Sequence, residues 1–343
     1  MLYLYQSYDV SDLAGAMSDL ICRFPLAPSQ QECVVVGNRS VANWLEHILT
    51  FRLGILANTR FPFPRGTVEE LLFGYEEMNS ASPKTSAANW DPDSLCWLIL
   101  VELWKYRGET WLDKVSRYLG WTSLSGDEVP ALGLKEYTFS RTLADLFDRF
   151  ITYRPRDVQN LAGVPELEDW QDILFRKLEL IHGDNHFANR LHHFMAAPDE
   201  VLRESLSSLR RVSLFVPNAW PPAYIGFWAR VSEFVDVHVF LQRYCSSYLL
   251  SEEVLGQRRS MTLRGWKGAL ASLTQLGEQN IWFAQKFYEE VSKTDHVEVL
   301  ISDYTPGVVE APDDGGLLNR SRFLVKRWCD EGDDLDPFET PSG

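Results

Sequence analysis

The sequence predicts an α/β fold in which a parallel sheet is interrupted by an inserted helical subdomain. Two strand-loop-helix patterns follow one another near the start, and short β-branched runs return after residue 200. Between them lies a long stretch in which apolar residues recur at helical spacing. Because successive strand-loop-helix units form parallel sheets with right-handed crossovers, we expect the flanking parts to build one α/β domain.

The first pattern begins with the apolar strand Leu2–Tyr5, followed by the polar, turn-like stretch Ser7–Ser11 and a helical stripe over 13–21. The second begins with Cys33–Val36, a β-branched run that suits a central parallel strand, and ends in a helical stripe over 41–49. The prolines at 62 and 64 then predict a break in regular structure through Gly66.

Residues 79–93 are rich in small and polar residues and predict a surface loop, and helical spacing dominates from Ser94 to about residue 195. Strand signals return at Val212–Val216 and Val235–Phe240, with an amphipathic helix between them and another over 260–295. The expected domains are residues 1–78 and 201–312 for the sheet domain, 94–200 for the helical subdomain, and 313–343 for an acidic tail or linker.

The chain has 343 residues and a formal net charge of −15 at pH 7. Such a length suits two packed lobes, and an acidic chain is unlike a free-standing nucleic-acid binder, since phosphate contacts need cations. One local basic face inside a larger complex remains compatible with this charge. The five cysteines are scattered, which indicates reduced thiols in a cytoplasmic protein. We find neither a signal peptide nor an apolar run that suits a membrane span.

Residues with catalytic chemistry do not form a complete set, so we expect no catalytic residue, no bound metal and no cofactor. Asp145 and Asp148 stand at i and i+3 on a helix without the third ligand that a nuclease metal site needs. His182 and His186 have a spacing that can ligate a metal, but the residues between them interrupt the helix. We interpret the histidines of this segment as a solvated patch that suits a DNA-facing surface.

Five local strings stand in one order along the chain. They are Met1-Leu2-Tyr3-Leu4-Tyr5-Gln6-Ser7, Val41-Ala42-Asn43-Trp44-Leu45, Gly54–Asn58 with Phe61–Pro64, Ala144–Asp148 with Tyr153-Arg154-Pro155, and Pro221-Pro222-Ala223-Tyr224. In this order and spacing they resemble the RecC family, the gamma subunits of bacterial exodeoxyribonuclease V. The resemblance continues weakly to about residue 300, and it covers only the first part of the family's usual length.

Members of that family are similar in fold to superfamily 1 helicases, so the resemblance implies a degenerate helicase-type sheet. An active helicase holds ATP with a glycine-rich loop and a lysine after its first strand, and Mg²⁺ with carboxylates after a later strand. Here Gln6, Ser7 and Asp9 occupy the first loop, which lacks glycine and lysine. Pro217 and Asn218 stand where the carboxylates are required. The resemblance therefore implies a nucleotide site that has lost its function.

In the family this lobe forms part of a tunnel that carries the unwound 3′-ending strand and contributes to reading the Chi recombination sequence. The resemblance places a set of candidate DNA-binding residues on that surface, which are Phe63, Asp145, Leu146, Asp148, Arg149 and Arg154. Phe63 and Arg149 depart from the leucine and glutamine of the best-known members, and Glu69 replaces a tryptophan that offers a stacking platform. Strand guidance is therefore implied, whereas recognition of the same Chi sequence is not.

The resemblance implies RecB-type and RecD-type subunits, a DNA end and single-stranded DNA as partners, and no membrane. The leading hypothesis is a non-catalytic DNA-guiding and scaffolding subunit of a helicase-nuclease in double-strand-break repair and recombination. One alternative is a short paralogue that regulates a RecB-type partner without touching DNA. Another is an α/β enzyme with an unrecognised site.

Two further sets of residues are candidates for contacts. Exposed tryptophans would suit assembly with partners, and the candidates are Trp90, Trp97, Trp104 and Trp121. Basic residues outside the main set are candidates for phosphate contacts, namely Arg156, Arg210, Arg211, Arg258 and Arg259. For each of these tryptophans core burial is the default expectation, and each of these arginines is more often a plain surface charge.

Overall fold

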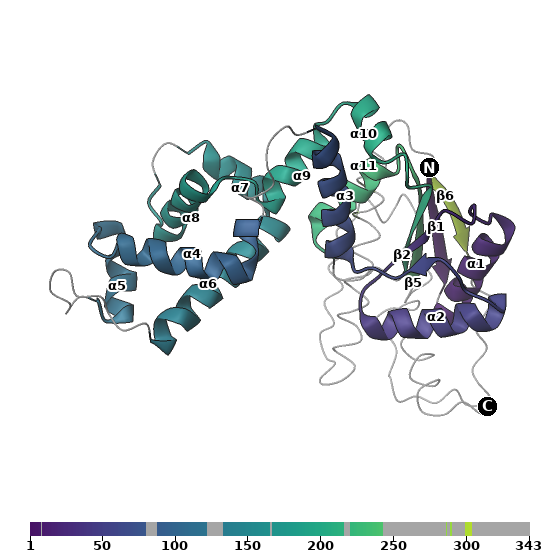
Figure 1. Ribbon diagram of the computed structural model, residues 1–343, viewed down its shortest axis with the longest axis horizontal. Helices are drawn as coiled ribbons and strands as arrows, with labels where there is room; N and C mark the ends of the chain where they lie inside the picture. The colour runs from purple at the N-terminus through teal and green to yellow at the C-terminus, as the bar shows by residue number, and fades with distance from the viewer. Residues whose placement is uncertain are drawn as a thin grey trace, which may run out of the picture. The chain divides into compact units, whose positions relative to one another are not determined.

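The computed structural model describes residues 1–7, 9–79, 88–121, 133–164, 167–215, 220–242, 286, 289 and 299–303. The chain divides into two compact units. One takes in residues 1–70 and the described residues from 206 onward, and we call it the sheet unit. The other takes in residues 71–205, and we call it the helical unit. Figure 1 labels their elements.

The sheet unit is an α/β structure with parallel strand pairing. Its elements are β1 (Leu2–Ser7), α1 (Val10–Arg23), β2 (Glu32–Val36), α2 (Arg39–Leu53), β3 (Thr59–Arg60), β4 (Arg211–Phe215), α11 (Pro222–Val231), β5 (Asp236–Gln242) and β6 (Val299–Asp303). The strands form a six-stranded sheet in the order β3-β2-β4-β5-β1-β6. Every neighbouring pair is parallel, with Leu2 opposite Val237 and Cys33 opposite Val212.

The centre of the sheet is buried because its strands are apolar on both faces. Every residue of β2 and β4 is buried, as expected for parallel strands that are covered on two sides. Helices α1 and α2 pack together on the sheet through Leu13, Met17 and Leu45, which join Val34 and Phe240 in one apolar cluster. Figure 1 shows these two helices beside the strands. This packing fixes the carboxyl ends of the strands, where the loop after β1 begins α1.

The helical unit consists of helices and connecting turns in the part of the chain that the structure describes. Its elements are the end of α3 (Pro64–Asn79), then α4 (Pro92–Lys105), η2 (Thr110–Leu112), α5 (Asp113–Leu119), α6 (Leu134–Tyr153), α7 (Pro155–Ala162), α8 (Trp170–His182), α9 (Phe187–Met195) and α10 (Asp199–Ser205). Helix α4 packs along α6 and also contacts α8, while α6 contacts α7 and α9.

The main sequence expectations are confirmed. Both strand-loop-helix patterns form, the later strands appear as β4 and β5, and helices fill the described part of the long helical stretch. Two local expectations were wrong. Pro64 is the first residue of α3 rather than a break, because a first-turn proline lacks only an N–H that has no partner there. Trp90 is buried rather than part of a surface loop, because its indole Nε1 donates to the carbonyl of Gly183 at 2.8 Å.

Several expectations fall on other parts of the chain. The helix expected over 260–295 lies outside the described residues except at positions 286 and 289. The acidic tail over 313–343 lies wholly outside them. The domain boundaries inferred from the sequence stay a prediction.

Candidate functional site

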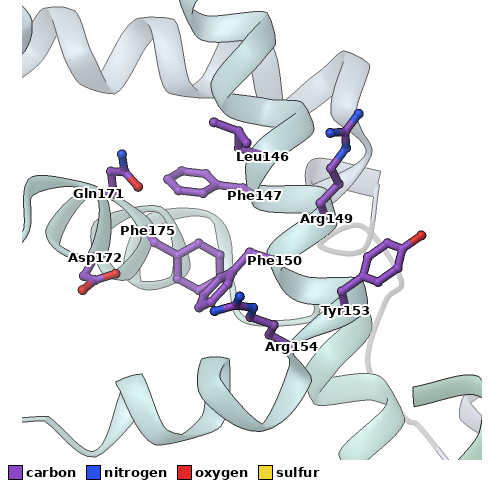
Figure 2. A pocket seen from close by; sticks show the side chains of 9 residues that line it. All are labelled: Leu146, Phe147, Arg149, Phe150, Tyr153, Arg154, Gln171, Asp172 and Phe175. Atoms are coloured by element: carbon purple, nitrogen blue, oxygen red, sulfur yellow. The ribbon is translucent and has the colours of Figure 1, made fainter. Parts of the chain in front are cut away.

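A pocket of about 690 Å³ lies in the helical unit between α6 and α8 (Figure 2). Apolar, aromatic and charged side chains line it together. They are Leu146, Phe147, Arg149, Phe150, Tyr153, Arg154, Gln171, Asp172 and Phe175. The size is within the range of clefts that bind small molecules or single groups of a larger ligand.

Helix α6 presents its lining residues because its two faces differ. Residues Leu143, Phe147 and Ile151 follow helical spacing and are buried within the helical unit. The neighbouring face carries Leu146 and Tyr153, which are 48% and 51% exposed although both are large and apolar or aromatic. An exposed face of this composition next to a pocket suits contact with a ligand.

The end of α6 is fixed by a proline. Pro155 disfavours helical geometry at the residue before it, and Arg154 accordingly has φ −130° and ψ 49°. Pro155 then opens α7 at its first position, where its missing N–H is tolerated. Arg154 therefore lies at the junction of two helices, with its side chain at the rim of the pocket (Figure 2).

Aromatic rings build the inner wall of the pocket. The rings of Phe147 and Phe150 form T-shaped pairs with the ring of Phe175, with centroid separations of 5.3 and 5.9 Å. The ring centroid of Trp90, which is not part of the lining, lies 5.3 Å from that of Phe175 and 5.0 Å from that of His186. Edge-to-face packing of this kind holds rings in place and leaves a rigid aromatic surface toward the pocket.

His186 is a structural residue rather than part of a solvated histidine patch, so that expectation was wrong for this residue, whereas His192 and His193 are exposed. Its side chain is fully buried and its Nε2 lies 2.8 Å from Oε1 of Glu179. Its Nδ1 accepts from the backbone N–H of Asn189, so the ring caps the N-terminus of α9. As predicted, the segment between His182 and His186 breaks the helix, since α8 ends at His182 and Gly183 has φ 87°.

Two arginines at the pocket make few contacts of their own. Arg149 is exposed and has no ion-pair partner among the described residues. Arg154 is 71% exposed and meets Asp157 only at 4.0 Å, a distance and exposure at which an ion pair is weak. Both guanidinium groups therefore remain available for an anionic ligand.

Helix α8 adds polar groups that sequence reasoning did not include. Gln171 and Asp172 stand in its first turn, after Asp169, whose side chain accepts from the backbone N–H of Gln171 at 2.8 Å. Burial, reinforced by the nearby charge of Asp169, raises the pKa of the Asp172 carboxyl. The periodicity of α8 had shown a helix, but only the packing of α8 against α6 shows which of its residues share this pocket.

The structure brings together part of the set that the resemblance implied. Leu146, Arg149 and Arg154 line the pocket. Asp145 instead lies 3.7 Å from Arg141 in an ion pair along α6, and Asp148 is partly buried outside the lining.

Phe63 belongs to the other unit. It is 46% exposed, and its carbonyl accepts from the backbone N–H and the hydroxyl of Thr67 at the start of α3, both at 3.0 Å. Glu69, which replaces the family's tryptophan, lies 2.9 Å from Arg65. A shared role for Phe63 and the pocket residues stays a prediction.

The loop after β1 is occupied by its own side chains. Ser7 is buried and donates to Oδ2 of Asp12 at 3.1 Å. Asp9 caps α1, because its Oδ1 accepts from the backbone N–H of Ser11 at 2.8 Å. A helix N-terminus can hold phosphate through such N–H groups, but here a carboxylate already occupies them. Gln6 is buried at the end of β1, while Pro217 and Asn218 lie outside the described residues.

The remaining arginine candidates differ in their surroundings. Arg211 is not a phosphate contact, because it is buried and its Nε donates to Oε2 of Glu32 at 2.9 Å on the neighbouring strand. Arg156 and Arg210 are exposed. Arg258 and Arg259 lie outside the described residues.

Of the four tryptophans considered for assembly, Trp90 and Trp121 are buried, and Trp104 is partly buried with its ring edge against Trp121. Trp97 is 54% exposed, one helical turn before the exposed Val101.

Two kinds of feature are absent within the described ranges. No three side chains of His, Cys, Asp or Glu stand close enough to hold a metal ion there. None of the helices described is both long and apolar enough to cross a membrane.

Comparison with known proteins adds the family context. The model of the family described as "RecC, N-terminal domain" matches residues 2–282. "RecBCD enzyme subunit RecC" of Mycolicibacterium smegmatis is 27% identical over 246 residues, which are 70% of this chain and 21% of that protein. The proteins of the same name from Haemophilus influenzae and Escherichia coli are 26% and 25% identical and match 72% of this chain. This chain covers 24% and 22% of their lengths, so it spans about a quarter or less of the relatives that it matches.

Proposed function

This chain belongs to the RecC family, and on that premise we propose that it is a non-catalytic, DNA-guiding and scaffolding part of a RecBCD-type helicase-nuclease. The proposed partners are a RecB-type and a RecD-type subunit, a DNA end and single-stranded DNA. The proposed process is double-strand-break repair and recombination in the cytoplasm.

One observation carries the DNA-guiding role, namely the combination of cations and aromatic rings at the pocket between α6 and α8. Proteins that bind single strands combine positive groups along the backbone path with aromatic surfaces on which bases stack. Arg149 and Arg154 supply the charge, and Phe150, Phe175 and Tyr153 supply the rings. This local pattern stands on a chain whose net charge is −15, so the cations are not part of a generally basic surface.

The non-catalytic part of the proposal is supported by the loop after β1. Asp9 caps α1 with a carboxylate at the place where an ATP-hydrolysing helicase holds phosphate. We therefore propose that the sheet derives from a superfamily 1 helicase-type domain. We also propose that the helical unit is inserted in it, because the chain leaves the sheet after β3 and returns at β4.

A second candidate function is docking on a RecB-type partner without DNA contact. The exposed side chains of Trp97 and Val101 favour it, since both lie on one side of α4. The ring of Tyr137 stands 5.5 Å from that of Trp97 and extends this apolar surface onto α6. Exposed aromatic residues of this kind are enriched in protein interfaces.

The test is to purify the full chain with a RecB-type and a RecD-type subunit and to measure co-elution and binding to a blunt DNA end. We expect a complex to form, and we expect its affinity for the DNA end to fall when Arg154→Ala is introduced. The matched control is Arg117→Ala, which removes an exposed arginine of α5 outside the pocket lining.

Each other outcome has a distinct meaning. A complex that forms but binds DNA equally well with Arg154→Ala would favour the docking function over strand guidance. Failure to form any complex would contradict the scaffolding role of this chain.

A further inference from the structure

Helix α8 places two hydrogen-bonding side chains at the same pocket as the arginines of α6. In Figure 2, Gln171 and Asp172 lie on one side of the pocket and Arg149 lies on the other. Rings of Phe150 and Phe175 stand between them. Within the described residues, neither Gln171 nor Asp172 makes a side-chain hydrogen bond. Their polar groups are therefore available to a ligand.

The charge pattern decides which part of a nucleotide fits which side. A phosphate would be repelled by the carboxylate of Asp172 and attracted by the guanidinium groups of Arg149 and Arg154. A neutral base has no such penalty beside Asp172, and its face can stack on an aromatic ring. The side of the pocket formed by α8 is thus suited to the base, and the arginines are suited to the strand's backbone.

The hydrogen-bonding groups further restrict the base. A carboxylate only accepts hydrogen bonds, whereas the amide of Gln171 both donates and accepts. Adenine, cytosine and guanine each present an exocyclic amino donor, and side-chain amides and carboxylates can accept hydrogen bonds from these amino groups. Thymine lacks such an amino group and presents a carbonyl acceptor in its place.

We propose that this pocket holds one unstacked base of single-stranded DNA and that Gln171 and Asp172 favour a base with an exocyclic amino group, which is adenine, cytosine or guanine, over thymine at that position. The base stacks against the rings of α6 and α8, and Arg149 and Arg154 contact the flanking phosphates. This proposal rests on the proposed function and adds specificity-determining residues from α8.

The experiment measures fluorescence anisotropy of labelled single strands with the full chain. The probes are oligothymidylates of about 12 nucleotides, either pure or with one central adenine, cytosine or guanine. We expect the single amino base to strengthen binding about tenfold, within the discrimination typical of good base contacts. Gln171→Ala and Asp172→Ala should each reduce that advantage while both proteins still bind pure oligothymidylate.

Control variants separate this proposal from its premise. Glu204→Ala removes an exposed carboxylate of α10 outside the pocket lining and should leave the base preference intact. Arg149→Ala with Arg154→Ala should weaken binding of every probe. Equal binding of all probes, or a preference that survives both α8 variants, would overturn the base-selection proposal while the arginine dependence still upholds strand guidance. Binding that is absent or independent of the arginines would overturn both.

Discussion

The loop after β1 and the pocket between α6 and α8 differ in whether their polar side chains have hydrogen-bond partners. In the loop, Asp9 and Ser7 bond to groups of the same segment, so the start of α1 is already satisfied. In the pocket, Arg149 and Gln171 make no side-chain contact of that kind within the described residues. The difference shows that the polar groups of this loop stabilise the start of α1, whereas under the proposed function those of the pocket contact a ligand.

The interior of the sheet unit shows the same internal pairing. Arg211 and Glu32 join neighbouring strands, and the guanidinium of Arg211 also donates to the carbonyl of Phe24 at 2.6 Å. The Nδ1 atom of His238 lies 3.0 Å from the hydroxyl oxygen of Tyr5. If these pairs serve stability, removing one member should loosen the sheet unit and leave the pocket of the helical unit unaffected.

The largest effect is expected from Arg211→Ala. The change leaves the carboxylate of Glu32 buried without its partner, and breaking such a pair destabilises a protein by about 3–5 kcal/mol. Hydrogen exchange followed by mass spectrometry should show loss of protection in β2 and β4, with little change in α6. Replacing both members, as Glu32→Leu with Arg211→Met, should restore most of the protection. Equal loss in α6 would contradict separate roles for the two units.

A smaller effect is expected from lowering the pH. Burial first, and then the positive charges of Arg211 and the Met1 amino group, lower the pKa of His238 from 6.5 to about 3. Between pH 6.5 and pH 3, His238 binds more protons in the unfolded chain than in the folded one. The stability that comes from keeping His238 neutral is therefore fully present above pH 6.5 and is lost as the pH falls toward 3. We expect the sheet unit to lose about 2 kcal/mol between pH 7 and pH 5. His238→Phe should flatten this part of a stability-against-pH curve, and an unchanged curve would exclude the cause.

The smallest effect concerns the cap of α1. Asp9→Ala removes the side chain that bonds to Ser11, and loss of an N-cap costs about 1 kcal/mol. This loss of stability should appear as faster amide hydrogen exchange in the first turn of α1. Asp9→Asn keeps an acceptor and should change exchange little. Neither variant should bind ATP, because glycine and lysine are still missing from the loop; ATP binding by Asp9→Asn would show that the carboxylate alone closes this site.

Much of the fold was predictable because its signals are local. Runs such as Cys33–Val36 and helical stripes such as 13–21 identify their elements within a few residues. The segment that holds Trp90 was assigned to a surface loop because the partner of Trp90, the carbonyl of Gly183, lies 93 residues away in the chain. Arg211 was misjudged for the same reason, since Glu32 is 179 residues away. Local composition carries no information about such partners.

The candidate site was predictable only where one helix supplies it. The resemblance, and not any spacing rule, named Leu146, Arg149 and Arg154, and the structure shows that these three residues of one segment line one pocket. Gln171 and Asp172 come from another helix, and no spacing rule links them to α6. Their contribution follows from the packing of α8, which depends on aromatic contacts such as Phe150 with Phe175.

The most direct test of the account is the salt dependence of single-stranded DNA binding by the full chain. Each phosphate contact contributes about 0.7 to the slope of log affinity against log salt for single strands. Arg149→Ala with Arg154→Ala should therefore reduce the magnitude of the slope by about 1.4, whereas Arg117→Ala should leave it unchanged. A slope that is the same with and without the two arginines would contradict the proposal that this pocket guides the strand.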